Sequence, residues 1–415
     1  MILKLSLINV LFMGTALFCS AVEWLEVRGG EKQGVVEAEG VPVKIDFDKD
    51  VVWKTKIPGK GWSSPVMSQG VIIVTTAVGT EKVELRVVAV DEKTGKILWN
   101  EKVFEPSEEE MKSCHFKNSF ASSTALISEG VVYAHFGHMG TAALALKTGA
   151  VKWRYHETFD SVHGNGPSPI LSDGVLVFTA DGKDEALVRA LDAQTGKKLW
   201  EKNREIEATR KFSFGTPLQI EMDGEPVVVT QGSEVVMAHR VKDGKLLWWL
   251  DAGDVWSVIP TPIVDEGVVY LSTGFGKTRL LAIELEGAKG DIKKTHVKWE
   301  AKKGVPTVPS FVIKDHTIYL LEDKGKLSAL NKEDGKTLWA TSLKRNFSGS
   351  PILVGNHFYS FTEEGVGYVH KVTPEGAEKL AENDFEEPIF SSPIIYDKTM
   401  ILRSETTLWR FGKSF

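Results

Sequence analysis

The chain has 415 residues, a net charge of -6, and 42% hydrophobic and 26% charged residues. This composition is ordinary for a soluble globular protein, and the mild negative charge argues against a nucleic-acid-binding surface. The 38 glycines and 12 tryptophans are more distinctive, because both are typical of turn-rich β structure.

The first 21 residues are expected to be a secretory signal peptide. Lys4 provides a positive start, residues 5–18 form an apolar stretch, and small residues allow cleavage after Ala21. The stretch is too short for a good membrane span. Lipidation of Cys19 is the alternative, although the bulky Phe18 departs from the usual small-residue site. We therefore expect a periplasmic or secreted protein with no transmembrane segment after cleavage.

Residues 22–48 are rich in Gly and Glu and precede the first repeated unit. We expect them to form an N-terminal arm that lies along the outside of the fold. Beyond the signal peptide the chain holds one cysteine, Cys114, which cannot form an internal disulfide. The fold must therefore depend on burial of an apolar core.

A Thr-Gly-x-x-x-Trp unit recurs through residues 49–415. The segment Ala89–Trp99 returns almost unchanged as Ala190–Trp200, and looser copies follow a spacing of about 40–54 residues, a period typical of propeller blades. The tryptophans and the turn glycines of this structural motif are Trp53, Trp99, Trp153, Trp200, Trp248, Trp299 and Trp339, and Gly95, Gly149, Gly196, Gly244 and Gly335.

An entry of small residues and proline precedes each unit, beginning with Ser63-Ser64-Pro65 and ending with Ser391-Ser392-Pro393. Eight such entries, each followed by β-branched runs, predict an all-β, eight-bladed β-propeller of four-stranded antiparallel blades. Glycine supplies a positive φ at each turn, and each tryptophan should wedge between neighbouring blades, burying roughly 150–250 Å².

Ring closure is also predicted. Only three segments that can form strands follow the last entry, at residues 394–396, 400–403 and 407–411. Residues 51–55 can supply the missing outer strand, so the N-terminal strand should join the C-terminal blade. Such closure removes exposed sheet edges.

These residues resemble the PQQ-like (quinoprotein-type) propeller repeat over essentially the whole chain after the signal peptide. Residues 24–29, 57–65, 115–122 and 163–169 are similar to secreted propellers of planctomycete and verrucomicrobial type. A more distant resemblance is to the BamB family of periplasmic scaffolds, which are eight-bladed propellers that assist outer-membrane protein assembly. That resemblance implies a scaffold.

Quinoprotein alcohol dehydrogenases share the blade repeat, and resemblance to them implies PQQ with calcium over the axis. They carry a vicinal cysteine pair that Cys19 and Cys114 cannot form, and no Glu/Asn/Asp calcium set is evident. We therefore expect no cofactor, with PQQ and calcium as the alternative.

The Thr-Gly turns should lie on one face, and the loops that enter the inner strands should surround the axial channel on the other. Candidate ligand-binding residues gather on this second face: Trp62, His115, Lys117, Asn118, His163, Asn165, Asp181, Arg204 and Trp256. The histidines, with Lys117 and Arg204, suit an anion or a glycan. The two tryptophans could stack on a sugar or quinone ring, or plug the channel.

A metal site is the second possibility on this face. His115, His138 and His163 come from neighbouring blades, and neutral imidazoles suit transition metals. No tight ligand spacing such as His-Glu-x-x-His is present, so hydrogen bonds that brace the loops are the competing interpretation.

Three functions remain open at this stage. The first is a non-catalytic monomeric scaffold or binding module for envelope proteins or glycans, with no nucleic-acid partner. The second is a quinoprotein-like oxidoreductase acting on an alcohol or sugar. The third is a polysaccharide hydrolase or lyase, which needs converging carboxylates; the loop acids available are Asp181, Glu234, Glu322 and Glu363.

Overall fold

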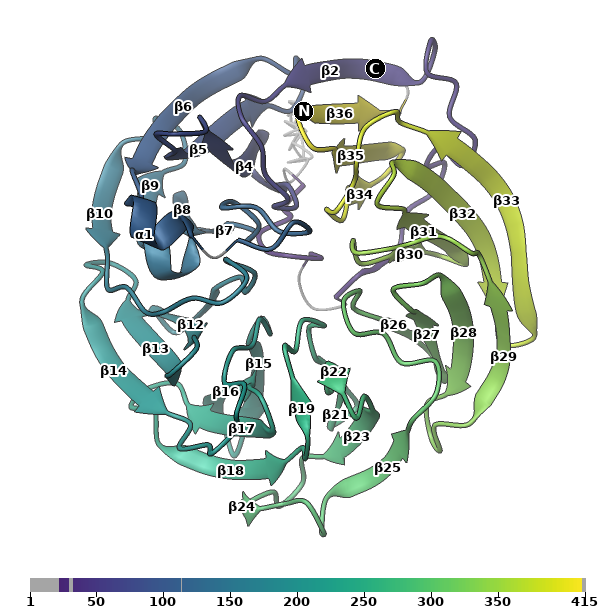
Figure 1. Ribbon diagram of the computed structural model, residues 1–415. Helices are drawn as coiled ribbons and strands as arrows, with labels where there is room; N and C mark the ends of the chain where they lie inside the picture. Colours follow the sequence, from purple (N-terminus) through teal and green to yellow (C-terminus); the bar gives the residue numbers. More distant parts are fainter. Residues whose placement is uncertain (1–21, 30–32, 113, 413–415) are drawn as a thin grey trace, which may run out of the picture.

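The computed structural model describes residues 22–29, 33–112 and 114–412. They form eight four-stranded antiparallel sheets arranged as a ring (Figure 1), which confirms the predicted eight-bladed β-propeller. The described helical segments are α1 (Glu108–Met111) and the 3-10 turn η2 (Gly137–Met139). The predicted signal peptide, its cleavage after Ala21 and the alternative lipid anchor at Cys19 lie outside the described residues.

The strands of each blade follow one another from the axis outward. Blades one to four contain β3 (Val66–Ser68), β4 (Val71–Val78), β5 (Glu84–Asp91) and β6 (Ile97–Phe104); β7 (Leu126–Ser128), β8 (Val131–His135), β9 (Thr141–Ala145) and β10 (Val151–Tyr155); β11 (Ile170–Ser172), β12 (Val175–Asp181), β13 (Ala186–Asp192) and β14 (Lys198–Asn203); and β15 (Leu218–Met222), β16 (Glu225–Gln231), β17 (Val235–Arg240) and β18 (Leu246–Asp251).

Blades five to eight contain β20 (Ile263–Asp265), β21 (Val268–Ser272), β23 (Leu280–Glu284) and β25 (Val297–Ala301); β26 (Val312–Lys314), β27 (Thr317–Leu321), β28 (Lys326–Asn331) and β29 (Thr337–Ser342); β30 (Ile352–Val354), β31 (His357–Phe361), β32 (Val366–Thr373) and β33 (Gly376–Asp384); and β34 (Ile394–Tyr396), β35 (Thr399–Arg403) and β36 (Thr407–Phe411) with β2 (Val51–Lys56). Short strands outside this pattern are β1 (Val35–Val36), β19 (Val255–Trp256), β22 (Phe275–Gly276) and β24 (Gly290–Asp291).

The core lies between the blades. Middle strands such as β12 and β27 are buried along their whole length, whereas the outer strand β29 is mostly exposed. Leu280 and Tyr270 of blade five pack with Ile318 and Leu320 of blade six in one apolar cluster. Burial of apolar area between sheets therefore holds the ring together without a disulfide.

The repeated Trp and Gly residues contact each other across neighbouring blades. The ring of Trp153 lies against Gly196 of the next blade, and its indole N–H donates to the carbonyl of Ala193 at 2.9 Å. A Cβ on Gly196, where φ is +73°, would lie 2.6 Å from the tryptophan ring. Glycine is therefore required both by the turn and by the neighbouring tryptophan. Trp53, Trp99, Trp200 and Trp299 pack on a turn glycine of the next blade in the same way.

The small residues of the blade entries have a specific role. In most neighbouring pairs of blades, the N–H of one Ser or Thr of the entry, which is Ser64 in blade one, donates to the hydroxyl of the equivalent residue in the next blade. These hydrogen bonds link the blades around the axis. These pairs, at 2.9–3.0 Å, are Ser64 with Thr124, Thr124 with Ser168, Ser168 with Thr216, Thr261 with Ser310, Ser310 with Ser350, and Ser392 with Ser64.

The predicted ring closure is confirmed. β2 pairs antiparallel with β36, and the N–H of Gly412 donates to the carbonyl of Asp50 at 3.0 Å. Trp53 on β2 then packs against Gly95 of blade one, so the closed junction uses the same contact as the others. The two ends of the propeller meet in one blade (Figure 1).

The expected position of the arm is wrong for its first half. Residues 22–29 and 33–36 lie on the inner strands and not outside the ring. Trp24 exchanges two backbone hydrogen bonds of 2.8 Å with Met67 of β3, Ile127 N–H donates to the Leu25 carbonyl at 2.8 Å, and β1 pairs with β30. Inner strands of a wide ring keep a free hydrogen-bonding edge, which the arm occupies. Only the following segment reaches the outer strand β33, through Val43 and Asn383.

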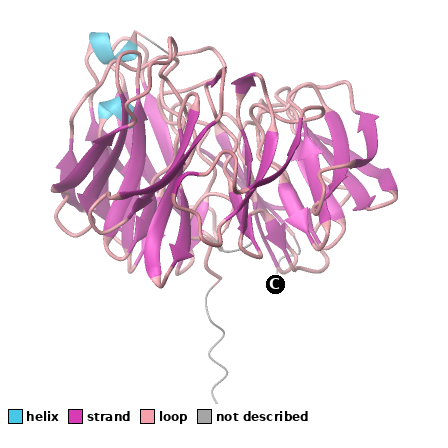
Figure 2. Cartoon of the chain, turned by 90° about the horizontal axis from the view of Figure 1, so that it is seen from below, coloured by secondary structure: helices cyan, strands magenta, loops and turns pink. Residues whose placement is uncertain are grey.

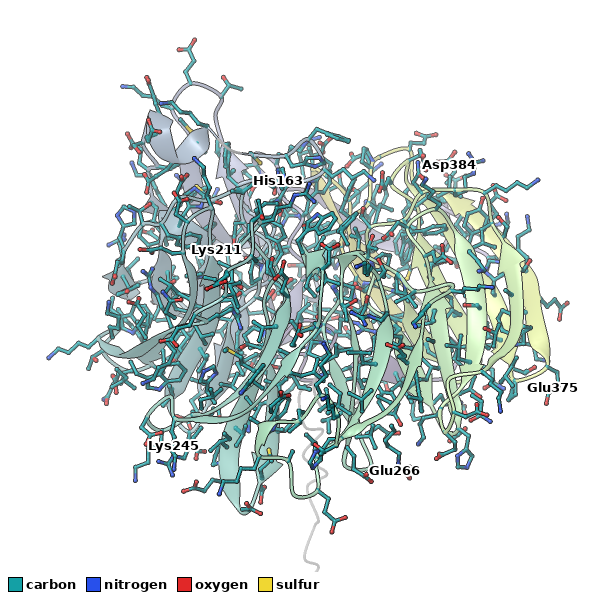
Figure 3. All side chains as sticks on the ribbon, turned by 60° about the horizontal axis from the view of Figure 1, so that its bottom comes forward. His163, Lys211, Lys245, Glu266, Glu375 and Asp384 are labelled. Carbon is teal, nitrogen blue, oxygen red and sulfur yellow. The ribbon has the colours of Figure 1, made fainter. Side chains whose placement is uncertain are left out.

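The two faces of the ring differ in what they carry. Lys245 and Glu375, beside the turns before outer strands, and Glu266 of an inner hairpin lie on the face that we call lower (Figure 3). His163 and Lys211 lie on the opposite, upper face, where α1 and η2 are also found (Figure 2). The predicted sorting of turns and entry loops is therefore correct. Each face has one mouth of the axial channel, and the described residues of the arm pair with the inner strands β3, β7 and β30.

Candidate functional site

A cavity of about 600 Å³ lies at the upper mouth of the channel, and we call it the upper-mouth cavity. Its lining comes from all eight blades: Trp62, His115, Lys117, Asn118, Ser122, His163, Gly166, Arg210, Phe212, Phe214, Trp256, Ser257, Ile259, Phe275, Val308, Ser348 and Phe390.

One position of the repeat contributes a lining residue from every blade. It is the residue directly before the small-residue pair of each entry, where successive blades carry Trp62, Ser122, Gly166, Phe214, Ile259, Val308, Ser348 and Phe390. The following residues are fixed by the links around the axis, whereas this position faces the cavity and varies from Gly to Trp. The repeat therefore builds the frame, and its least regular position shapes the site.

Aromatic side chains form two walls on opposite sides of the axis. Trp62 of blade one stacks on Phe390 of blade eight, with ring centroids 4.3 Å apart. Across the ring (Figure 1), Trp256 of β19 pairs with Phe275 of β22, close to Phe214 of blade four. Phe212 and Phe214 are two positions apart in an extended segment, so their side chains point to the same side. Their ring centroids are 6.2 Å apart, and both rings line the cavity.

The charged side chains of the lining are cationic. The Arg210 guanidinium lies 4.1 Å from the ring centroid of Trp256, a cation–π contact that fixes its position. Lys117 Nζ lies 2.7 Å from Glu363 Oε1, which also accepts from Ser348 at 2.7 Å. Among the described residues no Asp or Glu belongs to the lining itself. The upper-mouth cavity therefore favours an anionic group.

His115 and His163 meet in this cavity. Their ring centroids are 5.3 Å apart, and His115 N–H and Asn118 Nδ2 both donate to the carbonyl of His163, at 3.1 and 2.8 Å. Burial, and secondarily the neighbouring His115, lower the pKa of His163. His163 adopts a left-handed φ of +68°, a strained conformation often found at functional sites.

His138 and Asn165 lie outside the lining. His138 is buried, with Nε2 2.8 Å from the carbonyl oxygen of Glu110 in α1. Asn165 is buried too, and its Nδ2 donates to Ser123 Oγ at 2.6 Å. These two side chains brace the loops. No three His, Cys, Asp or Glu residues in the described ranges are grouped closely enough to hold a metal ion, so the three histidines are not assembled as ligands.

Asp181 and Arg204 form a buried ion pair between blades three and four. Arg204 Nε and Nη2 donate to the two carboxylate oxygens at 2.9 and 3.2 Å, and Nη1 donates to Thr230 at 2.9 Å. Both side chains are 0% exposed. Burial raises the pKa of Asp181, and the guanidinium opposes that shift. The pair supports the wall of the channel and does not reach the cavity.

Several lining residues were not predicted from the sequence: Arg210, Phe212, Phe214, Phe275 and Phe390. Two signals were present in the chain. The alternation of Phe212-Ser213-Phe214 places both rings on one side, and aligning the eight entries brings Phe390 and Phe214 to the position of Trp62. That alignment would have identified the floor of the cavity.

The lining does not fit PQQ with calcium. Ca²⁺ takes six to eight oxygen ligands, including carboxylates, and the lining offers one amide oxygen, on Asn118, which already accepts from Ser119 and Ser122. The acids considered for a hydrolase fit no better. None of Asp181, Glu234, Glu322 and Glu363 lines the cavity.

Comparison with known proteins agrees with this architecture. The family described as outer membrane protein assembly factor BamB matches residues 24–184, 184–359 and 323–413. The BamB protein of Yersinia pestis is 25% identical over 412 residues, covering 92% of this chain and 94% of that protein. Among the described residues no helix is long and apolar enough to cross a membrane.

Two solved structures share the fold. BamB from Moraxella catarrhalis aligns with a TM-score of 0.62 at 13% identity, covering 88% of this chain and 97% of that one. The quinohemoprotein alcohol dehydrogenase of Comamonas testosteroni aligns with a TM-score of 0.67 at 14% identity, covering 94% of this chain and 80% of that one. The match of the family to nearly the whole described chain decides between them: the protein belongs to the PQQ-like propeller family described as outer membrane protein assembly factor BamB.

Proposed function

We propose that this protein is a non-catalytic binding scaffold of the cell envelope, which holds an envelope protein or glycan at the upper mouth of its channel. The observation that carries the proposal is the cavity of about 600 Å³ with aromatic walls, cationic side chains and no acid in its described lining. Exposed rings extend this surface outward, since Phe116 is 80% and Phe275 37% exposed. Exposed aromatic surface of this kind marks an interaction site.

The compartment is supported by the signal peptide expected at residues 1–21. Relatives named as outer membrane protein assembly factors support a partner among envelope proteins. A monomer fits, because the arm and the closing strand complete the ring within one chain.

The chemistry of the cavity favours binding over catalysis. General acid–base hydrolysis of a glycan needs two suitably placed carboxyl groups, and the described lining holds none. Burial raises the pKa of Cys114, so its thiol is less available as a thiolate nucleophile next to the cavity.

Photo-crosslinking in envelope extracts tests this function. A crosslinker carried at Lys211 on the upper face should capture a partner, whereas one at Lys245 on the lower face should not (Figure 3). Capture at Lys211 should be lost in Trp256→Ala and retained in Leu98→Ala, which removes an exposed apolar side chain of an outer strand. Equal capture at both faces, or capture unaffected by Trp256→Ala, would contradict the proposal.

The quinoprotein alternative is tested separately. Incubation with PQQ and Ca²⁺ should give no saturable change in quinone absorbance and no dye reduction with alcohols or sugars. A saturable change that Trp256→Ala abolishes would favour the oxidoreductase.

A further inference from the structure

We propose that the upper-mouth cavity recognises an acidic glycan, with a sugar ring on the aromatic walls and a carboxylate or sulfate group at Arg210. This inference rests on the proposed function and names the chemical class of its ligand. The walls, the charges, the hydrogen-bonding groups and the state of the backbone at this mouth each bear on it.

The aromatic walls suit a ring-shaped ligand. Trp62 with Phe390, and Trp256 with Phe275, lie on opposite sides of the axis. The face of an aromatic ring carries negative charge density. The C–H groups on the face of a sugar ring carry a small positive charge and are attracted to it. Ser122 and Gly166 on one side and Ser348 on the other leave room between the walls.

Arg210 is prepared for an anionic group. Its guanidinium rests 4.1 Å from the ring centroid of Trp256, and among the described residues it makes no ion pair within 4.0 Å. The planar fork of arginine binds carboxylate or sulfate oxygens through two parallel hydrogen bonds. Holding the guanidinium on Trp256 reduces the side-chain entropy lost when the anion binds.

The polar groups of the lining suit hydroxyls. His115, His163 and Ser257 present imidazole and hydroxyl groups between the two walls. Lys117 adds a second cation, which Glu363 neutralises at 2.7 Å. An anionic substituent near Lys117 would compete with Glu363, so Arg210 is the dominant charge contact.

The backbone at this mouth disfavours an extended peptide. β19 and β22 pair with each other, and N–H groups of the entry segments, including Ser64, Thr124 and Ser168, already donate to hydroxyls of neighbouring blades. A peptide strand needs free main-chain donors and acceptors. Here side chains face the ligand, which favours a glycan over a polypeptide.

Calorimetric titration of the full chain with defined oligosaccharides tests the inference. The probes are tetragalacturonate, a sulfated galactan tetrasaccharide, fully methyl-esterified tetragalacturonate and a hexaglutamate peptide. At least one acidic tetrasaccharide should bind. The esterified form, which keeps the rings but loses the charge, and hexaglutamate, which keeps the charge but lacks the rings, should each bind at least about tenfold more weakly.

Matched variants locate the contact. Arg210→Gln and Trp256→Ala should each weaken binding of the acidic tetrasaccharide by about tenfold or more. Lys277→Gln is the control, because Lys277 is exposed on the same face, next to Phe275 and Gly276, but is outside the lining. It should leave binding within about twofold, as expected for a screened surface charge.

Each other outcome overturns the inference. Binding of neither acidic tetrasaccharide, equal binding of the esterified form or of hexaglutamate, or equal losses in Lys277→Gln and Arg210→Gln would do so. If no glycan binds and Trp256→Ala still loses an envelope protein in the crosslinking experiment, the ligand class is wrong and the scaffold function stands.

Discussion

The lower and upper mouths of the channel are made by the same eight blades but are finished differently. At the lower face the polar groups of the turns form hydrogen bonds with each other. Asp91 accepts from the N–H and hydroxyl of Thr94, and Asp192 accepts from the same groups of Thr195. The described residues of the arm then add hydrogen bonds to the inner strands β3, β7 and β30. At the upper face the entry loops differ from blade to blade, and they leave a cavity open.

The difference shows where a repeat protein can change without losing its ring. The repeated Trp, the turn Gly and the Ser or Thr that links the entries contact the next blade, so a change at one of them disturbs a junction. The residue before each entry faces the cavity and makes none of these repeated junction contacts, so it can vary. Binding specificity therefore gathers at the upper mouth.

The largest expected effect is a loss of folding stability on replacing Trp248, compared with Trp256 eight positions later. Trp248 is fully buried between blades four and five, and Trp248→Ala should lower the free energy of unfolding by about 3–5 kcal/mol. Trp256→Ala removes a partly exposed ring of the cavity and should cost less than about 1.5 kcal/mol while abolishing ligand capture. Urea unfolding measures both. Equal destabilisation by the two changes would break the distinction between frame and site.

The contact of the arm with the inner strands can be tested at Trp24. Trp24 is buried against β3, and Trp24→Ala should destabilise the fold by about 3 kcal/mol. Leu25→Ala, at a neighbouring exposed side chain of the same arm, should cost under about 1 kcal/mol. Thermal unfolding checks the pair. If Trp24→Ala leaves stability unchanged, the arm does not contribute to the closed ring.

The contact between blades can be tested at one turn glycine. Gly196→Ala places a Cβ 2.6 Å from the Trp153 ring at a φ of +73° and should cost about 2 kcal/mol or more. Gly174→Ala has a similar φ of +74° but nothing within 4 Å, so only backbone strain remains, about 1 kcal/mol. Chemical denaturation of the two variants isolates the contact. Equal losses would mean that the turn conformation alone explains the glycine.

The last prediction concerns the acid sensitivity of His135, below the upper mouth. His135 is buried in the channel wall, and burial lowers its pKa to about 3. Between about pH 6.5 and 3 the unfolded chain binds a proton at this side chain that the folded chain does not bind, so stability falls as the pH falls, by up to about 1.4 kcal/mol per pH unit. His135→Gln should flatten the dependence measured by urea unfolding between pH 7 and 5. An unchanged slope would show that His135 does not titrate in this way.

The candidate site was predicted in part. Trp62, His115, Lys117, Asn118, His163 and Trp256 lie together in the cavity, because the topology of a propeller brings all entry loops to one mouth. Asp181, Arg204, Asn165 and His138 occur in the same loops or at strand ends but turn into the wall, where they satisfy one another or the backbone. Loop position predicted the face of these residues and not the direction of their side chains.

The eight blades, their antiparallel order and the joining of the two ends could be predicted from the amino-acid sequence, because the contacts that enforce them repeat at a regular spacing. The tertiary structure alone decided the path of the arm and the composition of the cavity. Both depend on the width of the closed channel, which leaves inner strand edges for the arm and brings side chains from all eight blades together. No local pattern contains that distance, since it is fixed by the number of blades that pack around the axis.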